Sequence, residues 1–340
     1  MAKERSYVAS VRHHMAWGLM AATAGVFGLG ACSLSAEAEA EGTGELPAST
    51  FTTEQALAVC ESFITDFCAA IESCTPDTFA LNFVDQADCV ARQSVGCAAT
   101  LVLPGITATD TQLAECGAKV SADDCSFFEA DGDLVFNACD FRGALPADEV
   151  CLVGVQCGSG YCGNASGDAC GGRCYPLRSE GEECSDGNLA KQCDEDLGCP
   201  GGSGSCAPLV NVGDACSADA ACPRWSECVD GVCVSVGREG DACDNFECNG
   251  DLMCGTSPTA EGFLCVPYTL ADAGQACDPE AEPPILCNNG FCTASGCVET
   301  VAPGEACTPD DDCGFNASCV NGTCQLASVT ANIDRCYPDE

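Results

Sequence analysis

The sequence predicts a small disulfide-rich fold, in which an N-terminal α-helical, disulfide-linked domain is followed by an array of short β-hairpin cysteine-rich repeats. Three observations predict this class. The chain has 340 residues and 35 cysteines, and it begins with a leader that is first basic and then apolar. Apolar residues recur at helical spacing within 51–145. Residues 146–326 are dominated by Gly, Asp and Cys in repeated units, and such cysteine density in an exported chain is typical of a disulfide scaffold.

Residues 1–31 have the features of a secretory signal peptide. Lys3, Arg5 and Arg12 make the start basic, and residues 15–29 form an uncharged, mostly apolar run. This run is shorter than the roughly 20 residues that a transmembrane helix needs. A cleaved signal is therefore favoured over the alternative of an anchor helix.

The leader ends in a short motif, Leu29-Gly30-Ala31-Cys32, that resembles the lipobox of bacterial lipoproteins. The resemblance implies that, after Sec-type export, the Cys32 thiol carries diacylglycerol and becomes the new N-terminus, anchored by several acyl chains. Ser33, in place of an aspartate, favours the outer membrane or cell surface by analogy with enteric bacteria. Residues 32–50 contain no aromatic residue and many Ala, Glu and Ser, so we expect a flexible tether.

Charge and cysteine usage after the leader exclude several classes of function. The mature chain holds nine Lys/Arg and 51 Asp/Glu, a formal charge of −42. Nucleic-acid binding depends on Lys/Arg that neutralise phosphates, so no nucleic-acid partner is expected, whereas cationic partners and divalent cations are permitted. Both histidines lie in the leader and no two cysteines are spaced as CxxC, which argues against zinc sites. The 34 cysteines after Cys32 are an even number, as complete disulfide pairing requires.

The region after the tether is predicted to be helical. Thr52 and Gln55 fit a capping box, T-x-x-Q. An apolar stripe follows at intervals of three and four residues, formed by Leu57, Cys60, Ile64, Phe67 and Ile71. A second helix is expected after Asp85, running towards Leu101, and a third, shorter helix over about 110–119.

Cysteine spacing in this region predicts two bridges. Cys60 and Cys68 are eight residues apart, as are Cys89 and Cys97. Each interval corresponds to about 12 Å of helix. Two antiparallel helices would therefore place Cys60 level with Cys97 and Cys68 level with Cys89. A Cys74–Cys89 bridge is the alternative that spacing leaves open.

Residues 146–326 are predicted to form six cysteine-rich repeats of about 30 residues each. Segments 213–233 and 304–324 share the spacing C-x5-C-x5-C-x4-C. Looser copies begin at Gly181, Gly240 and Gly274. A repeat of this length is too short for a core of its own, so bridges worth about 2–4 kcal/mol each must hold it. We therefore expect a bead-like array without a single core.

Two further features complete the array. Asp230-Gly231 and Asn321-Gly322 lie between short cysteine-flanked runs, which predicts type I′ hairpin turns. The first copy, 151–174, has a fifth cysteine, and its expected partner is Cys336 in the C-terminal tail, 327–340.

The motif G-[ED]-x-C-x5-C-x5-C-x4-C resembles the cysteine-rich repeats of Dickkopf N-terminal and EB-type modules. The whole layout resembles a group of exported Gram-negative lipoproteins with a lipobox, a helical cysteine domain and such repeats. VQCGSGYC (155–162) is similar to that group's Q-C-x-S-x-x-C element, and CGGRC (170–174) to its C-G-x-C with one residue inserted. The resemblance implies recognition and not catalysis, and it carries over no ligand-contact residues.

Candidate chemistry is sparse. The mature chain has no histidine to act as a general base, and neither a G-x-S-x-G motif nor a phosphate-binding loop occurs, so we expect no enzyme and no cofactor. Acidic clusters at 129–133 and 309–313 could bind calcium, but neither completes an EF-hand loop. Arg224 and Trp225 lie in the short loop CPRWSEC, and Trp and Arg are enriched at binding hot spots.

The sequence thus predicts a lipid-anchored cell-envelope protein with a recognition, adhesion or structural role. Its expected partners are the membrane, through the anchor, and a protein or glycan ligand. One alternative is a protease inhibitor that presents the Arg224-Trp225 loop. The other is a calcium-binding surface protein.

Overall fold

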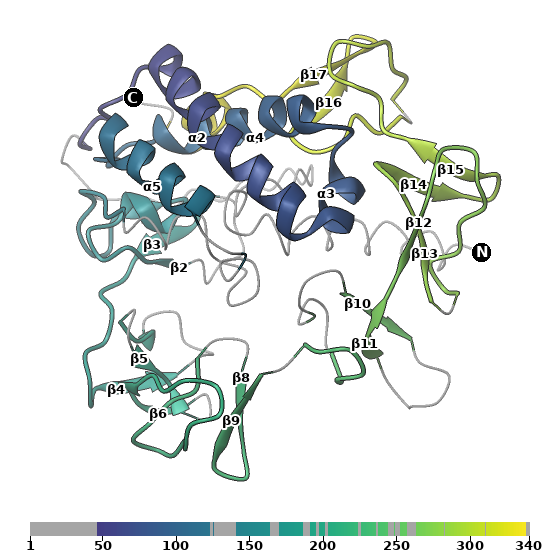
Figure 1. Ribbon diagram of the computed structural model, residues 1–340. Coiled ribbons are helices and arrows are strands. Elements are labelled where there is room, and N and C mark those ends of the chain that lie inside the picture. The colour runs from purple at the N-terminus through teal and green to yellow at the C-terminus, as the bar shows by residue number, and fades with distance from the viewer. Residues whose placement is uncertain are drawn as a thin grey trace.

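The computed structural model describes residues 46–122, 125, 141–163, 170–185, 191–194, 197–200, 203–223, 226–235, 237–243, 248, 252–256, 263–281, 283–309 and 311–337. It confirms the predicted fold class. A layer of helices is followed along the chain by a succession of small sheets, which curve away from the helices and return to them (Figure 1). Within these ranges, none of the helices combines the length and the hydrophobicity that a bilayer crossing requires.

Four helices form the N-terminal region. Their bounds are α2 Thr53–Cys74, α3 Pro76–Asn82, α4 Gln86–Leu101 and α5 Asp110–Ala122. The capping box is present at the start of α2, where the N–H of Thr52 and the N–H of Gln55 each donate to the other residue's side chain. Helix α3 fills a segment that sequence reasoning left as a connection. Pro76 begins it, because the fixed φ of proline suits the first position of a helix.

Helices α2 and α4 run antiparallel and are joined by two disulfides. The bridges are Cys60–Cys97 and Cys68–Cys89, the two pairs that the spacing predicts. Cys74 bonds to Cys125 and not to Cys89. The buried core between the helices includes Phe63, Ile64, Phe67, Ile71, Val95, Leu101 and Leu113.

The repeats contain short strands. Their bounds are β1 Val150–Cys151, β2 Cys162–Gly163, β3 Gly172–Cys174, β4 Glu183–Ser185, β5 Leu197–Gly198, β6 Ser203–Ser205, β7 Ala207–Pro208, β8 Ser226–Val229, β9 Val232–Ser235, β10 Leu252–Thr256, β11 Phe263–Pro267, β12 Thr269–Ala271, β13 Ile285–Cys287, β14 Gly290–Thr293, β15 Gly296–Glu299, β16 Ala317–Val320 and β17 Thr323–Leu326. Strands β1, β3 and β2 form a three-stranded sheet, and the others pair in twos. All described pairs are antiparallel except β12–β13, which is parallel.

One disulfide pattern recurs along the array: the first cysteine of a repeat bonds to the third and the second to the fourth. The pairs after the first repeat are Cys184–Cys199, Cys193–Cys206, Cys216–Cys228, Cys222–Cys233, Cys243–Cys254, Cys248–Cys265, Cys277–Cys292, Cys287–Cys297, Cys307–Cys319 and Cys313–Cys324. The first repeat has Cys151–Cys162 and Cys157–Cys174, and its extra Cys170 bonds to Cys336.

In four of the six repeats a Gly-acid pair precedes the first cysteine, and this pair forms a tight turn. In the repeat that starts at Asn211, Gly213 has φ of 93°, which glycine adopts at little cost. The Asp214 N–H donates to the Asn211 carbonyl at 3.0 Å, and the Asp214 carboxylate accepts the Asn211 N–H at 3.2 Å. The Cys233 N–H then donates to the Asp214 carbonyl at 2.9 Å, which ties the last cysteine to the turn. The acid of the motif therefore has a structural role.

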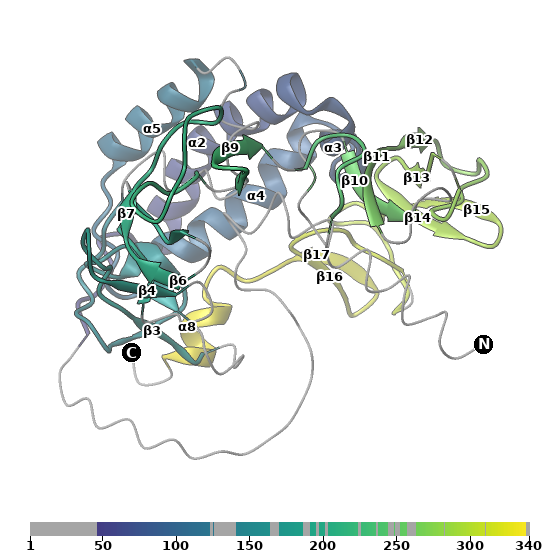
Figure 2. The ribbon, with the colours of Figure 1, turned by 90° about the horizontal axis from the view of Figure 1, so that it is seen from below.

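The ends of the array do not behave as independent beads, contrary to expectation. Val150 and Val153 of the first repeat and Leu326 of the last pack against the helical core. The segment expected as a tail contains helix α8, Ala331–Cys336, which lies beside β3 (Figure 2). These contacts give the helices a shared core with both ends of the array, because apolar residues far apart in sequence meet there.

Candidate recognition site

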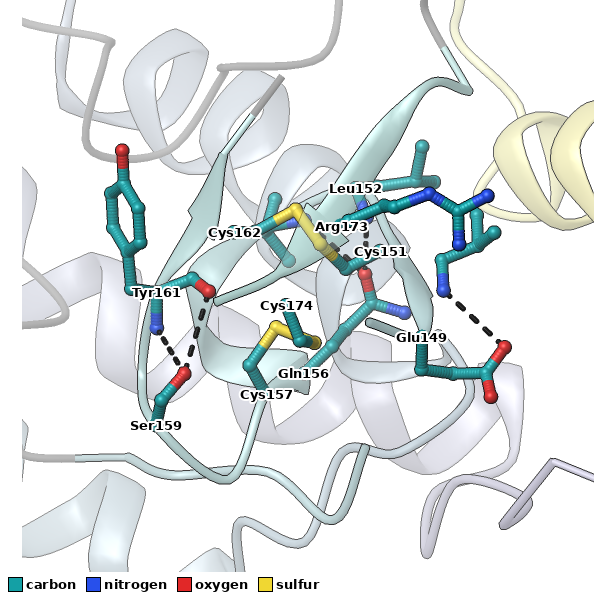
Figure 3. The surroundings of a disulfide bond; sticks show 12 residues. Glu149, Cys151, Leu152, Gln156, Cys157, Ser159, Tyr161, Cys162, Arg173 and Cys174 are labelled. Carbon is teal, nitrogen blue, oxygen red and sulfur yellow. Dashed lines mark hydrogen bonds between the residues drawn. A yellow bond between two sulfur atoms is a disulfide. The ribbon is translucent and has the colours of Figure 1, made fainter. Parts of the chain in front are cut away.

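The first repeat is joined to the helical region through Gln156, the Q of the Q-C-x-S-x-x-C element. Its side chain is fully buried, with 0% exposure, and lies beside the disulfides Cys151–Cys162 and Cys157–Cys174 (Figure 3). Its Oε1 accepts the N–H of Leu152 at 2.7 Å and that of Val153 at 3.2 Å. The Oε1 atom is thus used within the repeat, whereas the amide nitrogen donates to residues outside the repeat.

That amide nitrogen joins three parts of the chain. Gln156 Nε2 donates to the Pro104 carbonyl at 2.8 Å, just after α4, and to the Tyr337 hydroxyl at 3.1 Å, just after α8. Tyr337 Oη in turn donates to the Val150 carbonyl at 3.4 Å. Together with the Cys170–Cys336 disulfide, these bonds fix the first repeat and the C-terminal segment to the helices.

The last repeat is joined to the helical region through Arg92 of α4. The side chain is buried, with 1% exposure, and its Nε lies 2.6 Å from an Asp88 carboxylate oxygen. Its Nη1 donates to the carbonyls of Cys313, at 2.5 Å, and Phe315, at 3.0 Å. In return, Asn316 Nδ2 donates to the Arg92 carbonyl at 3.0 Å. A guanidinium supplies several donors in a planar fork, which suits this set of acceptors.

Two glycines allow the close approach at this joint. A Cβ on Gly314, whose φ is +74°, would lie 2.7 Å from Arg92 Nη1. A Cβ on Gly96 of α4 would lie 2.9 Å from Asn316 Nδ2. Because the last repeat covers this side of α4, every residue from Arg92 to Leu101 is buried. The sequence predicted a helix here but not its continuous burial, because the repeat that covers it is distant in the chain.

Fixed at both ends, the array projects its middle repeats away from the helices. The fifth repeat has its own contact with α3, where the Asn289 N–H donates to the Ala80 carbonyl at 2.7 Å. The β8–β9 hairpin lies on the side of the array farthest from the helical layer (Figure 1). The repeat that contains this hairpin is therefore displayed by the fold.

The β8–β9 hairpin has one bridged face and one apolar face. Its turn, Asp230-Gly231, has positive φ at both residues, 52° and 81°, as a type I′ turn requires. The register pairs Val229 with Val232 and Glu227 with Val234, so these four side chains share one face. The opposite face carries Cys228 and Cys233, whose bridges to Cys216 and Cys222 attach the hairpin to its repeat.

The apolar face is exposed. Val229, Val232 and Val234 are 47%, 40% and 40% exposed, and Val212 of the same repeat and Leu209 just before it are also exposed. The remaining exposed large apolar side chains among the described residues are Val84, Phe263, Val298 and Val320. Five of the nine exposed large apolar side chains of the described chain thus lie between Leu209 and Val234.

Several of the sequence-predicted site residues lie outside the described residues. These are Cys32, Arg224, Trp225 and the acidic cluster at 129–133. In the second cluster, Asp311 accepts the backbone N–H of Thr308 at 2.6 Å, and Asp312 accepts that of Gly314 at 2.7 Å. Both carboxylates therefore accept hydrogen bonds from backbone N–H groups of their own loop, which gives them a structural role.

Cysteine clusters in the repeats bring sulfur atoms together without leaving thiolates. The sulfurs of Cys216, Cys222 and Cys228 all lie within 4.8 Å of one another. Each of these cysteines is disulfide-bonded, as are the other cysteines of the described chain. Their proximity follows from the interleaved bridges of the repeat.

Sequence reasoning missed the two joint residues, Arg92 and Gln156. A signal existed for each: Arg92 follows Asp88 by four residues in a chain with few cations, and Gln156 is the first residue of the Q-C-x-S-x-x-C element. Neither signal names the partner, because the partners lie 221 and 181 residues away in Cys313 and Tyr337.

Comparison with known proteins supports the repeat assignment. Residues 202–235, which contain the β8–β9 hairpin, match the EB module. The chain is similar to Prion-like-(Q/N-rich) domain-bearing protein 25 of Caenorhabditis elegans, with 27% identity over 217 residues. That match covers 55% of this chain but 30% of the relative, so the chain spans under a third of that protein's length. No solved structure matches the chain. The disulfide-rich repeats, one of them EB-like, indicate an extracellular structural or adhesion-type role.

Proposed function

We propose that the protein is a lipid-anchored scaffold of the cell envelope that displays cysteine-rich repeats for recognition. One observation carries the proposal: both ends of the array are fixed on the helical region, while the EB-like repeat projects from its far side. The lipobox-like Leu29-Gly30-Ala31-Cys32 and the tether that follows it supply the anchor. The proposed location is the outer membrane or cell surface.

The architecture favours binding over catalysis. The interleaved disulfides and the two joints hold the repeats in fixed positions, so a partner would not have to order them, and this lowers the entropic cost of binding. The mature sequence has no histidine, and bridges consume the cysteines of the described chain. These features support a role in adhesion or recognition.

The anchor is tested by detergent-phase partitioning of the full chain. Wild type should enter the detergent phase with its leader cleaved and an acylated Cys32, whereas Cys32→Ala should lack the acyl chains and keep its leader. Ser33→Ala changes the neighbouring residue without removing the thiol, and it should behave as wild type. If wild type and Cys32→Ala partition and are processed alike, the lipid anchor is wrong.

Display of the array is tested by limited proteolysis and scattering in solution. Fixed ends predict a compact particle whose first cuts fall in the middle repeats. Loss of the joint at Arg92 should release the last repeat from α4 and add cuts in that repeat. The particle should stay compact, because the Cys170–Cys336 disulfide still holds the segment that follows the repeat. A wild-type particle with the dimensions of an extended string of beads would contradict the display model.

A further inference from the structure

We infer that the β8–β9 hairpin binds an extended, cationic segment of a partner protein, which adds as a strand along the outer edge of β8. The inference rests on the proposed recognition role and is independent of the lipid anchor. It combines an apolar face, an unpaired strand edge and an excess of acidic over basic residues, all in the EB-like repeat.

The apolar face is not required by the repeat scaffold. The last repeat has the same cysteine spacing and the same hairpin, in which β16 pairs with β17. At the positions of Val232 and Val234 it carries Thr323 and Gln325, which lie on the equivalent face. The fold therefore tolerates polar residues there. The exposed valines of β8–β9 need another explanation, and exposed apolar clusters of this kind mark interaction sites.

The two edges of the hairpin differ. The outer side of β9 is covered by its own repeat, where Val232 bridges to Ala215 and the Cys233 carbonyl accepts the Gly213 N–H at 2.7 Å. In the part of the chain that the structure describes, no strand or bridge pairs with the outer side of β8. An open edge accepts an extended peptide through main-chain hydrogen bonds, with alternate side chains continuing the exposed face.

Charge selects the partner. Asp214, Asp219, Glu227 and Asp230 are all exposed, and the sequence from 203 to 235 holds a single cationic residue, Arg224. Glu227 lies on the apolar face itself, opposite Val234. A second copy of this chain would bring the same carboxylates together within a molecule of net charge −40, which opposes edge-to-edge pairing. A segment with alternating apolar and Lys/Arg side chains complements both features.

The test uses a defined peptide and the full chain with Cys32→Ala, which removes the proposed anchor. The probe is acetyl-Lys-Val-Lys-Val-Lys-Val-Lys-amide, and its affinity is measured by isothermal titration calorimetry. The key variant, Val232→Thr with Val234→Gln, introduces the residues of the last repeat and leaves the charge unchanged. The matched control is Val298→Thr on β15, where the replaced valine is equally exposed, at 40%.

We expect the double variant to bind the peptide about tenfold more weakly, because it loses apolar contact area, and Val298→Thr to bind as wild type. Hydrogen exchange should show new protection of backbone amides in β8. A peptide with Glu in place of Lys, or with a central Pro that removes a ladder donor, should not bind.

Three results would overturn the inference: equal affinity of wild type and double variant, equal binding of the Glu peptide, or concentration-dependent dimers in sedimentation that involve the valine face. The first would mean attraction by charge alone. Disulfide mapping of the double variant verifies that its bridges are intact. Because the anchor is absent from the assay, failure here leaves the partitioning result standing, and the two proposals fail separately.

Discussion

Replacement of Arg92 by alanine should open the joint between α4 and the last repeat. The change leaves Asp88, whose side chain is 10% exposed, without its ion-pair partner, and it leaves the carbonyls of Cys313 and Phe315 without their donor. Removing one partner of a buried pair costs about 3–5 kcal/mol. The opening equilibrium of the joint should therefore rise on the order of a thousandfold.

Hydrogen exchange by mass spectrometry measures this opening directly. The disulfides of the last repeat remain, so its hairpin should stay protected, whereas the amides of α4 that the repeat covers should exchange faster. The Ala327 N–H, which donates to the Asn316 carbonyl at 2.8 Å beside the joint, should exchange faster as well. Arg92→Lys retains a charge opposite Asp88 but loses the fork of donors, so an intermediate rate is expected.

The control is Arg173→Ala in the first repeat. Arg173 is exposed and donates to the Asp148 carbonyl at 2.6 Å, far from α4 in the sequence, so its loss should leave the exchange of α4 unchanged. The reasoning is refuted if Arg92→Ala exchanges like wild type. It is equally refuted if both arginine variants have the same effect on α4.

Three perturbations of individual residues and one of the whole scaffold follow from the same structure. Gly314→Ala should loosen the last repeat in the same exchange assay, since its Cβ would lie 2.7 Å from the buried guanidinium. The control is Gly322→Ala, where φ is +81° and no atom lies closer than 3.9 Å to the added Cβ. This control introduces backbone strain without a clash, so it should leave the joint closed. Gln156→Glu should lower the melting temperature, because a carboxylate cannot donate to the Pro104 carbonyl and the Tyr337 hydroxyl as the amide does. The expected loss in the free energy of unfolding is about 1–3 kcal/mol. An unchanged melting curve would show that these hydrogen bonds do not hold the first repeat on the helices. Burial, and secondarily the neighbouring Tyr175, raise the pKa of Tyr161 above its ordinary value of 10.0. The contribution of Tyr161 to stability is therefore present below pH 10.0 and is lost as the pH rises through the pKa of the folded state. Tyr175→Phe should lower the pKa of Tyr161 in an ultraviolet phenolate titration. Full reduction should abolish the protease resistance of the middle repeats while circular dichroism retains part of the helical signal, and repeats that stayed compact would reveal a core beyond the bridges.

Features that depend on local spacing were predictable from the sequence. The eight-residue intervals of Cys60/Cys68 and Cys89/Cys97 predicted the bridges between α2 and α4, because helical rise converts sequence distance into length. The Asp-Gly and Asn-Gly dipeptides predicted the hairpin turns, since both positions require positive φ. The repeat spacing identified the array, although it left the pairing within each repeat open.

Features that depend on contacts between distant segments were decided by the tertiary structure alone. Spacing gives no reason for the first cysteine of a repeat to bond to the third, because several connectivities satisfy the same intervals. The continuous burial of α4 from Arg92 to Leu101 depends on a repeat more than 200 residues later. Arg92 becomes a joint only where that repeat supplies the Cys313 carbonyl, 221 residues away. Gln156 likewise acquires its role from Tyr337, 181 residues away. Local patterns fix helices, turns and candidate bridges because their partners lie within a few residues, whereas the closure of the array depends on surfaces that exist only once the separate parts have folded.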